Sequence, residues 1–360
     1  MRVAHTTFVR CAMSYYNFFG NDIANKQLVL RKSPWLPSIL LPEDHIILGN
    51  TPFNGWPDWD SFVSACHSLS KQISPPTWVF VDASWDPVMS TNHTLTQYIE
   101  GLKEIFPKSK VCMLSANACH FYDNLPGCVY LPYFLMHNNH GELNYRSKAG
   151  RIGCLNRRNA LHRVWLMHHL LDQRLIDPQR DIYSIRFTDM NSGAYQDVDY
   201  LLNITGFNQL QQQWPTQIQT HPDGFPNDYS IDHPAWHTGI VIITETDPTP
   251  CVMMSEKTAK GILSKSCFSV YMGEAGYKVL EDLGFEPRFF STHAEEYNID
   301  PILDICRNIT TEQQALEYRN LHLDKINHNF EWFAYGQGNL NQRPWWPKYQ
   351  LKLNAALDML

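Results

Sequence analysis

The sequence predicts an α/β protein built from two Rossmann-like domains that face each other across a cleft. The first observation is size, because 360 residues with 44% hydrophobic side chains can bury two cores of ordinary dimensions. The second is an alternation of strand-like and helix-like segments that occurs twice, on either side of a polar stretch over residues 137–153. We therefore predict a first domain over residues 1–145, a second over 146–335 and a helical tail over 336–360.

The first domain contains four short apolar runs separated by helix-like segments. The run TWVFVD ends in a carboxylate and is typical of a buried parallel strand. Helices are predicted where apolar residues return every three or four positions, as at Phe62, Cys66 and Leu69. In chain order we predict a strand at His45–Gly49, a helix at Trp59–Ile73, a strand at Thr77–Asp82, a helix at Leu95–Phe106, and strands at Lys110–Ser115 and Cys128–Tyr133.

The second domain repeats the alternation. The runs DIYSIRF, GIVIITE and SCFSVYM are apolar and rich in β-branched or aromatic residues, which favours strands. Glycine at position 284 is expected to end the last of the intervening helices. In chain order we predict a helix at Asn156–Leu171, a strand at Asp181–Phe187, a strand at Gly239–Glu245, a helix at Glu256–Ser264, a strand at Ser266–Met272, a helix at Gly276–Leu283, and helix in two pieces over Thr311–Leu360.

Composition excludes several classes of protein. A formal net charge of -7 argues against a simple electrostatic binder of nucleic acid. No stretch of about 18 apolar residues predicts a membrane-spanning helix, and no secretory signal is recognisable. The nine cysteines are odd in number and lack CxxC spacing, so we expect free thiols and a cytoplasmic location. No GxGxxG follows a predicted strand, which disfavours a nucleotide-dependent oxidoreductase.

The strongest candidate site lies between a predicted strand that ends in Thr244-Glu245-Thr246 and the helix after it. Ser255 is placed to cap that helix, and Glu256 suits its first turn. Lys257 and Thr258 follow, and a lysine beside exposed backbone amides at a helix N-terminus suits a phosphate. The alternative is an ordinary capped helix that binds nothing.

A basic run forms the second candidate. No acidic residue occurs between Glu142 and Asp172. In a negatively charged protein such a run indicates an anion site or a surface for nucleic acid, and the alternative is a solvated helix start. Its cations are Arg146, Lys148, Arg151, Arg157, Arg158 and Arg163, and His162 shares a predicted helix face with Arg158.

Together the two segments resemble the donor half of fucosyltransferase-like glycosyltransferases, including related reading frames of bacteriophages and large viruses. The resemblance rests on TET, SEKT and the run NRRNALHR, and covers roughly residues 156–297. It implies a GT-B arrangement of two Rossmann-like domains. It also implies that Glu256 and Lys257 contact the ribose and phosphates of a nucleotide diphosphate sugar, in a donor site with Arg157, Arg158, His162, Arg163, Glu245, Ser255 and Thr258.

Sugar transfer further requires an acceptor and, in inverting enzymes, a base. Asp82 and Asp86 follow a predicted strand of the first domain and are the candidate bases, although Asp82 could instead cap a turn. The donor chemistry requires no cofactor, and we expect no metal, because the two DxD patterns at 58–60 and 197–199 suit capping or surface roles. The proposed acceptor is a hydroxymethylated pyrimidine in phage DNA, flipped out of a duplex. The alternatives are a glycan, a lipid-linked sugar or a protein as acceptor, or a non-catalytic nucleotide-sugar-binding protein.

The tail carries a mixed aromatic and basic segment over residues 343–349, RPWWPKY. Such a surface can stack bases or sugars. The alternative, which we favour, is that Trp345 and Trp346 fasten the last helix to the rest of the fold.

Overall fold

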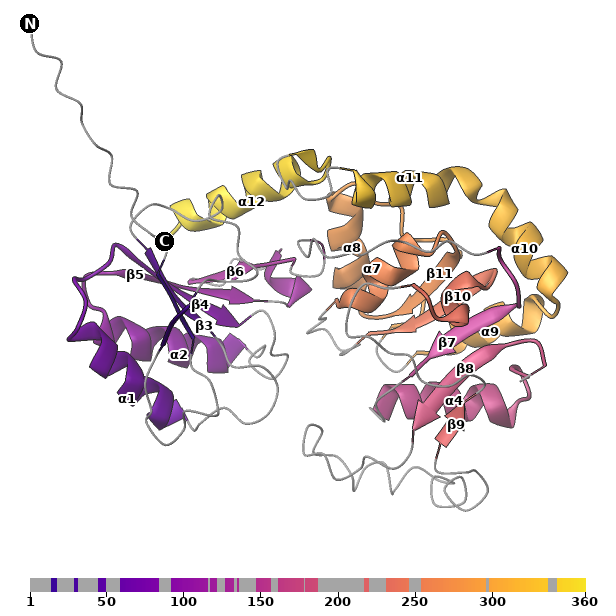
Figure 1. The fold of residues 1–360 in the computed structure, drawn as a ribbon, viewed down its shortest axis with the longest axis horizontal. Coiled ribbons are helices and arrows are strands. Elements are labelled where there is room, and N and C mark those ends of the chain that lie inside the picture. Colours follow the sequence, from indigo (N-terminus) through magenta and orange to yellow (C-terminus); the bar gives the residue numbers. More distant parts are fainter. Residues whose placement is uncertain are drawn as a thin grey trace, which may run out of the picture. The chain divides into compact units, whose positions relative to one another are not determined.

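The computed structural model in Figure 1 divides into two compact units, which are described separately. The first comprises Met1–Leu131 with Gln350–Leu360, and the second comprises Pro132–Tyr349. The domain boundary predicted at residue 145 lies outside the described part of the chain. The structure describes residues 14–17, 29–31, 45–49, 59–83, 92–115, 117–121, 127–132, 135, 147–156, 161–177, 179–186, 217–219, 231–245, 254–295, 298–335 and 342–360.

The first unit contains a six-stranded sheet in the order β2-β1-β3-β4-β5-β6. All neighbouring strands run parallel except β1 and β2, which pair antiparallel. The four predicted strands are confirmed, whereas the two N-terminal strands were not predicted. Their bounds are β1 Ser14–Asn17, β2 Val29–Arg31, β3 His45–Gly49, β4 Trp78–Ala83, β5 Lys110–Ser115 and β6 Cys128–Tyr130.

Two helices cover one face of this sheet, α1 (Trp59–Ser70) and α2 (Asn92–Ile105) (Figure 1). Alternate strand residues point at them, so that Leu48, Val81 and Met113 pack with helix side chains in one core. The intervening strand residues, such as Phe80, are also buried, as expected for parallel strands. The helical spacing read from Phe62, Cys66 and Leu69 is confirmed, because all three side chains belong to that core.

The second unit contains a five-stranded sheet in the order β11-β10-β7-β8-β9, parallel except for β9. Strand β7, which lies inside the basic run, was not predicted. The helix predicted from Asn156 begins at Leu161 in the structure. The bounds are β7 Ile152–Leu155, β8 Ile182–Arg186, β9 Gln217–Gln219, β10 Ile240–Thr244 and β11 Cys267–Tyr271.

The direction of the chain through this sheet reverses beside β7. Strand β8 lies on one side of β7 and β10 on the other, so the β7–β10 border is a topological switch point. The crossover helices are α4 (Leu161–Asp172) and α7 (Glu256–Leu263). Right-handed crossovers in opposite directions place these helices on opposite faces of the sheet. Ligands of open α/β sheets bind at the carboxyl ends of the strands at such a point.

The remaining helices follow β11. Helix α8 ends beside Gly284, whose φ of +97° is the left-handed conformation expected of a helix-terminating glycine. The C-terminal helical region has three pieces rather than two, because Thr311 opens one helix with a capping box and His322 separates it from the next. The bounds are α8 Glu274–Asp282, α9 Asp300–Asn308, α10 Glu312–Leu321, α11 Leu323–Ala334 and α12 Trp346–Asp358, with short 3-10 turns η3 Ala118–Phe121 and η4 Pro234–His237.

The tryptophan pair, the cysteines and the lengths of the helices were also the subject of predictions. Trp345 and Trp346 are fully buried, so they fasten the chain at the start of α12 and do not form an exposed stacking surface. The cysteines in the described residues are free thiols, and nearly all are buried. Within the same residues, no helix is both long and apolar enough to cross a membrane.

Gly153 illustrates how closely the centre of the second unit is packed. A Cβ added at this position of β7 would lie 2.1 Å from the carbonyl oxygen of Ala235 in η4. Because backbone must move to relieve that clash, we expect Gly153→Ala to lower the free energy of unfolding by about 3 kcal/mol. Denaturant titration measures this, with Gly101→Ala in α2 as the matched control, where helix propensity predicts slight stabilisation. A Gly153→Ala protein as stable as the parent would contradict the packing described.

Candidate active site

The candidate site lies at the carboxyl ends of β7 and β10, at the switch point of the second sheet. The Oγ1 hydroxyl of Thr244 donates a hydrogen bond to Oδ1 of Asn156, which ties the ends of the two strands together. The backbone amide of Asn156 donates to the backbone carbonyl of Ser184 at 3.0 Å, which links the neighbouring strand β8 to the same edge. Hydrogen bonds therefore link the carboxyl ends of β7, β8 and β10 at this edge of the sheet.

Helix α7 begins at this edge of the sheet with the predicted cap. Ser255 precedes the helix in an extended conformation, and its Oγ accepts from the amide of Lys257 at 3.3 Å. The same hydroxyl donates to the carboxylate of Glu245, the residue that follows β10. The predicted cap is confirmed, and it connects the first turn of α7 to the end of the strand.

Glu245 is the junction of the site. Its carboxylate is completely buried and accepts from the Thr258 amide at 3.1 Å and from the Thr258 hydroxyl, in addition to Ser255. Its backbone carbonyl accepts from Nε2 of His162 at 2.8 Å and from Nη2 of Arg163 at 3.1 Å. The side chain of Glu245 thus binds the start of α7, and its backbone carbonyl binds the first turn of α4.

The accessible charges of the site are Glu256 and Lys257. Their side chains are 35% and 23% exposed, and Nζ of Lys257 lies 3.1 Å from Oε1 of Glu256 and 3.1 Å from Oγ of Ser255. Partial burial raises the pKa of Glu256, but the charge and hydrogen bond of Lys257, together with the Lys260 charge, lower the pKa to about 2. An ammonium and an ionised carboxylate are therefore both presented at the start of α7.

The backbone amides of this turn are less available than the sequence suggested. The amide of Lys257 is bonded to Ser255, and the amide of Thr258 is bonded to Glu245. A phosphate at this helix start would consequently be held by the Lys257 side chain and by the positive end of the helix, and not by a cradle of free amides.

The basic run divides into cations with internal partners and cations outside the described residues. Lys148 donates to the carbonyls of Trp236 and Ser264 and to the hydroxyl of Ser266, and burial followed by the nearby Arg319 charge lowers its pKa to about 7. Arg151 is buried against Asp181, and Arg163 is buried under the end of β10. These three cations therefore have partners within the second unit, and the donor contact expected of Arg163 stays a prediction. Arg146, Arg157 and Arg158 lie outside the described residues.

His162 is a neutral bracing residue in this site. Burial, followed by the adjacent Arg163 charge, lowers its pKa to about 3, so its Nε2 donates to Glu245 as an uncharged imidazole. A histidine in the unfolded chain titrates near 6.5. Between these values the unfolded state binds the extra proton, and the stability contributed by the neutral ring falls as the pH drops from about 6.5 towards 3.

We expect His162→Gln to flatten the pH dependence of stability by about 1.4 kcal/mol per pH unit between pH 6 and 4. The free energy of unfolding, measured by denaturant titration across this range, tests the expectation. His67→Gln, at an exposed position of α1, serves as the control. Parallel curves for the parent and the His162 variant would exclude a buried neutral imidazole.

The two candidate bases belong to the first unit. Asp82 is the fifth residue of β4, where its backbone pairs with Gly49 and Leu114, so the strand continues one residue beyond it. Asp86 lies outside the described residues. Their role as bases stays a prediction.

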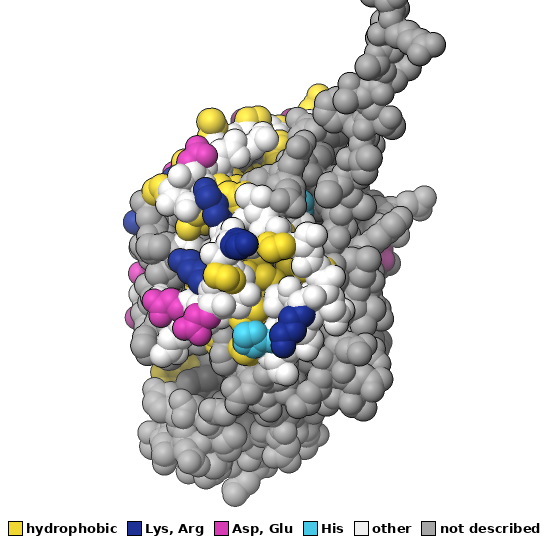
Figure 2. Space-filling model, turned by 90° about the vertical axis from the view of Figure 1, so that its left-hand side faces the viewer, with side chains coloured by type: hydrophobic (Ala, Val, Ile, Leu, Met, Phe, Trp, Pro, Cys, Tyr) yellow, Lys and Arg dark blue, Asp and Glu magenta, His cyan; other side chains and the backbone are white. Residues whose placement is uncertain are grey.

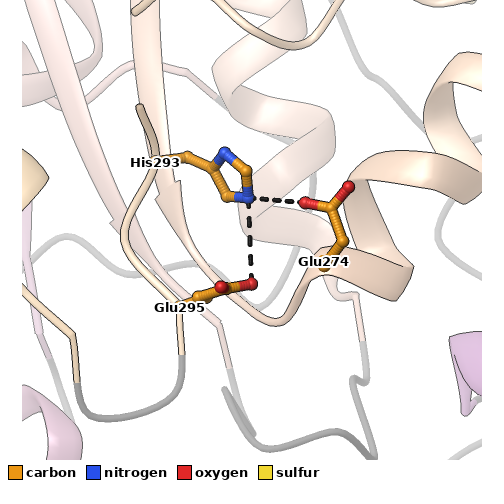
Figure 3. A group of neighbouring side chains, drawn as sticks. All are labelled: Glu274, His293 and Glu295. Carbon is orange, nitrogen blue, oxygen red and sulfur yellow. Dashed lines mark ion pairs between the residues drawn. The ribbon is translucent and has the colours of Figure 1, made fainter. Parts of the chain in front are cut away.

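A second polar cluster, not predicted from the sequence, lies at the start of α8, which follows β11 in the same sheet. Figure 3 shows the carboxylates of Glu274 and Glu295 both facing Nε2 of His293, which lies 2.7 Å from Glu274 and 3.9 Å from Glu295. This is the group of described residues that can offer three ligand atoms to a cation. Arg288 already occupies it, because its guanidinium pairs with Glu274 at 2.7 Å and with Glu281. The charged groups of this cluster are thus paired with one another in an ion-pair network. The sequence feature that could have indicated the cluster is Glu274, an acidic residue at the start of a helix that follows a strand.

No protein family and no curated protein matches this chain. Among solved structures, it is similar to the DNA-modifying enzyme β-glucosyltransferase, which was studied with and without its substrate uridine diphosphoglucose. The two share 13% sequence identity over 86% of this chain and 82% of the other, with a TM-score of 0.43. A likeness of this size assigns no function to this chain.

Proposed function

We propose that this protein transfers a sugar from a nucleotide diphosphate sugar to an acceptor hydroxyl. The observation that carries the proposal is the first turn of α7, where the partly exposed Lys257 and Glu256 stand beside the switch point of the second sheet. Such edges bind nucleotides in open α/β sheets. The resemblance of SEKT to the donor motif of fucosyltransferase-like enzymes supports the same assignment.

The two side chains suit different parts of that donor. The Lys257 ammonium can stabilise the negative charge that develops on the diphosphate as its bond to the sugar breaks. The Glu256 carboxylate remains ionised and can accept hydrogen bonds from the ribose hydroxyls. We propose that Arg157 and Arg158, which come shortly after β7 in the sequence, add to the charge around the diphosphate. The proposed donor site then requires no metal and no further cofactor.

The transfer itself joins the acceptor oxygen to the anomeric carbon. As that bond forms, the bond between the sugar and the diphosphate breaks, and the diphosphate leaves with the electron pair. The acceptor hydroxyl loses its proton to a base, for which we propose Asp82 or Asp86.

As acceptor we propose a hydroxymethylated pyrimidine in phage DNA. The support is the likeness of the SEKT and NRRNALHR segments to reading frames of bacteriophages. The described cations of the basic run do not add to it, because Lys148, Arg151 and Arg163 serve the protein interior. On the face of the first unit shown in Figure 2, the described Lys and Arg side chains lie among described Asp and Glu side chains, and these described residues form no field of one sign. Duplex binding is therefore expected to be weak without donor. A steep fall of that binding with salt would support the DNA acceptor, and no duplex binding at low salt would overturn it.

Two measurements test the proposal. Thermal shifts with UDP-, GDP- and dTDP-sugars test donor binding, since a ligand of the folded state raises its apparent stability. Transfer of radiolabelled sugar is then measured to duplexes containing hydroxymethylcytosine or cytosine, and to glycan, lipid-linked and protein acceptors. Transfer to hydroxymethylcytosine alone supports both parts. Transfer to another acceptor overturns the DNA acceptor, and binding without transfer or donor hydrolysis overturns the enzyme.

A further inference from the structure

We infer that Glu245 is a positioning residue that fixes the place of Lys257 through Ser255, and that it makes no contact with the donor. This inference rests on the proposed function, since it assigns the role of one residue within that donor site. It also departs from the resemblance, which places an acidic residue at this position among the donor contacts.

Both oxygens of the Glu245 carboxylate are already used. Oε2 accepts from the hydroxyl of Ser255, and Oε1 accepts from the amide and the hydroxyl of Thr258. The residue has no exposed surface. A ribose hydroxyl could reach this carboxylate only by displacing the first turn of α7, whereas the adjacent Glu256 is partly exposed.

The connection to Lys257 runs through one hydroxyl group. A serine hydroxyl has one proton and two lone pairs. In Ser255 the proton is directed to Glu245, which leaves the lone pairs for the amide of Lys257 at 3.3 Å and for its Nζ at 3.1 Å. The buried carboxylate therefore sets the orientation of the hydroxyl, and the hydroxyl holds the ammonium.

A glutamine cannot reproduce this arrangement in either orientation. If its NH₂ group faces Ser255, the hydroxyl loses its acceptor and has to give up a bond to Lys257. If its NH₂ group faces Thr258, it meets the donating backbone amide of that residue, and the Thr258 hydroxyl has to turn from donor to acceptor. The contacts to His162 and Arg163 involve the backbone carbonyl, so Glu245→Gln leaves the α4 side of the junction in place.

The experiment is a double-mutant cycle between Glu245 and Ser255. Dissociation constants for UDP, GDP and dTDP are measured for the parent, Glu245→Gln, Ser255→Ala and the double variant, with the exposed Glu331→Gln as a matched control. We expect each single change to weaken binding about tenfold, the effect of one hydrogen bond to a charged group. The double variant is expected to remain near tenfold, and Glu331→Gln near unity.

Two outcomes would overturn the inference. Factors that multiply to about a hundredfold in the double variant would indicate that Glu245 contacts the ligand on its own, and an unchanged affinity of Glu245→Gln would show that it positions nothing. If the parent binds no nucleoside diphosphate, the proposed function fails separately. Hydrogen exchange at the amides of Lys257 and Thr258 then decides the positioning role, which requires faster exchange in Glu245→Gln and the parental rate in Glu331→Gln.

Discussion

Replacement of Lys257 by alanine is expected to lower kcat/KM for sugar transfer by about 100- to 1000-fold while the protein remains folded. The expected loss corresponds to removal of one preorganised positive group from a developing diphosphate charge. Among the described residues, the hydrogen bonds of the Lys257 side chain go only to Ser255 and Glu256, at the start of its own helix. Its ion pair is with the neighbouring Glu256, and a cation in the first turn of a helix opposes the helix dipole. Steady-state kinetics and thermal unfolding of the same preparation measure both quantities.

The matched control for this change is Lys278→Ala on α8, which removes an exposed lysine from another helix of the same unit. We expect it to change neither activity nor stability measurably. Lys257→Arg keeps the charge and is expected to retain part of the activity, whereas alanine is not. Full activity of Lys257→Ala would remove the residue from the donor site, and unfolding of that variant would show that its role is structural.

The elements that the sequence predicted correctly depend on local signals. The Ser255 cap, the end of α8 beside Gly284 and the buried strand β10 each follow from a few adjacent residues. Strand β7 was missed for a related reason. Its four residues include a glycine and follow a cation, and they become a strand because β10 and β8 pair on either side.

The partners of the charged residues could not be predicted in the same way. The spacing of the basic run shows that cations are concentrated there, but Arg151 is satisfied by Asp181, 30 residues further on, and by a carbonyl of Cys306. The resemblance likewise placed Glu245 among the donor contacts, and only its enclosure by Ser255 and Thr258 suggests another role. Long-range burial decides such cases, and the sequence pattern does not contain it.

Replacement of Asp181 by asparagine is expected to lower the free energy of unfolding by about 3–5 kcal/mol. Nε and Nη2 of Arg151 contact the two Asp181 oxygens at 2.9 and 2.6 Å, and both side chains are essentially buried. The carboxylate also accepts from the amides of Ile152 and Asp177. Removal of its charge leaves the Arg151 guanidinium buried without a counter-ion, and urea titration measures the loss.

Asp304→Asn provides the control, because the Asp304–Arg307 pair has a similarly short contact of 2.7 Å but is 59% and 44% exposed. An exposed pair of this kind is expected to contribute less than about 1 kcal/mol. The double variant Arg151→Met with Asp181→Leu should be more stable than Asp181→Asn, since it removes both charges and leaves neither unpaired. Equal effects at Asp181 and Asp304 would mean that the Arg151 pair is not buried in solution.

The affinity for nucleoside diphosphates distinguishes Arg151, a structural cation, from Lys257, the proposed donor-binding cation. Arg151 joins the start of β7 to carbonyls at Leu175, Cys306 and Ile309, all within the protein. Folded Asp181→Asn protein, measured well below its unfolding midpoint, should therefore bind nucleoside diphosphates with parental affinity, although Lys257→Ala should not. A matching loss of affinity in Asp181→Asn at full folding would mean that Arg151 contributes to the anion site, as the position of the basic run first indicated.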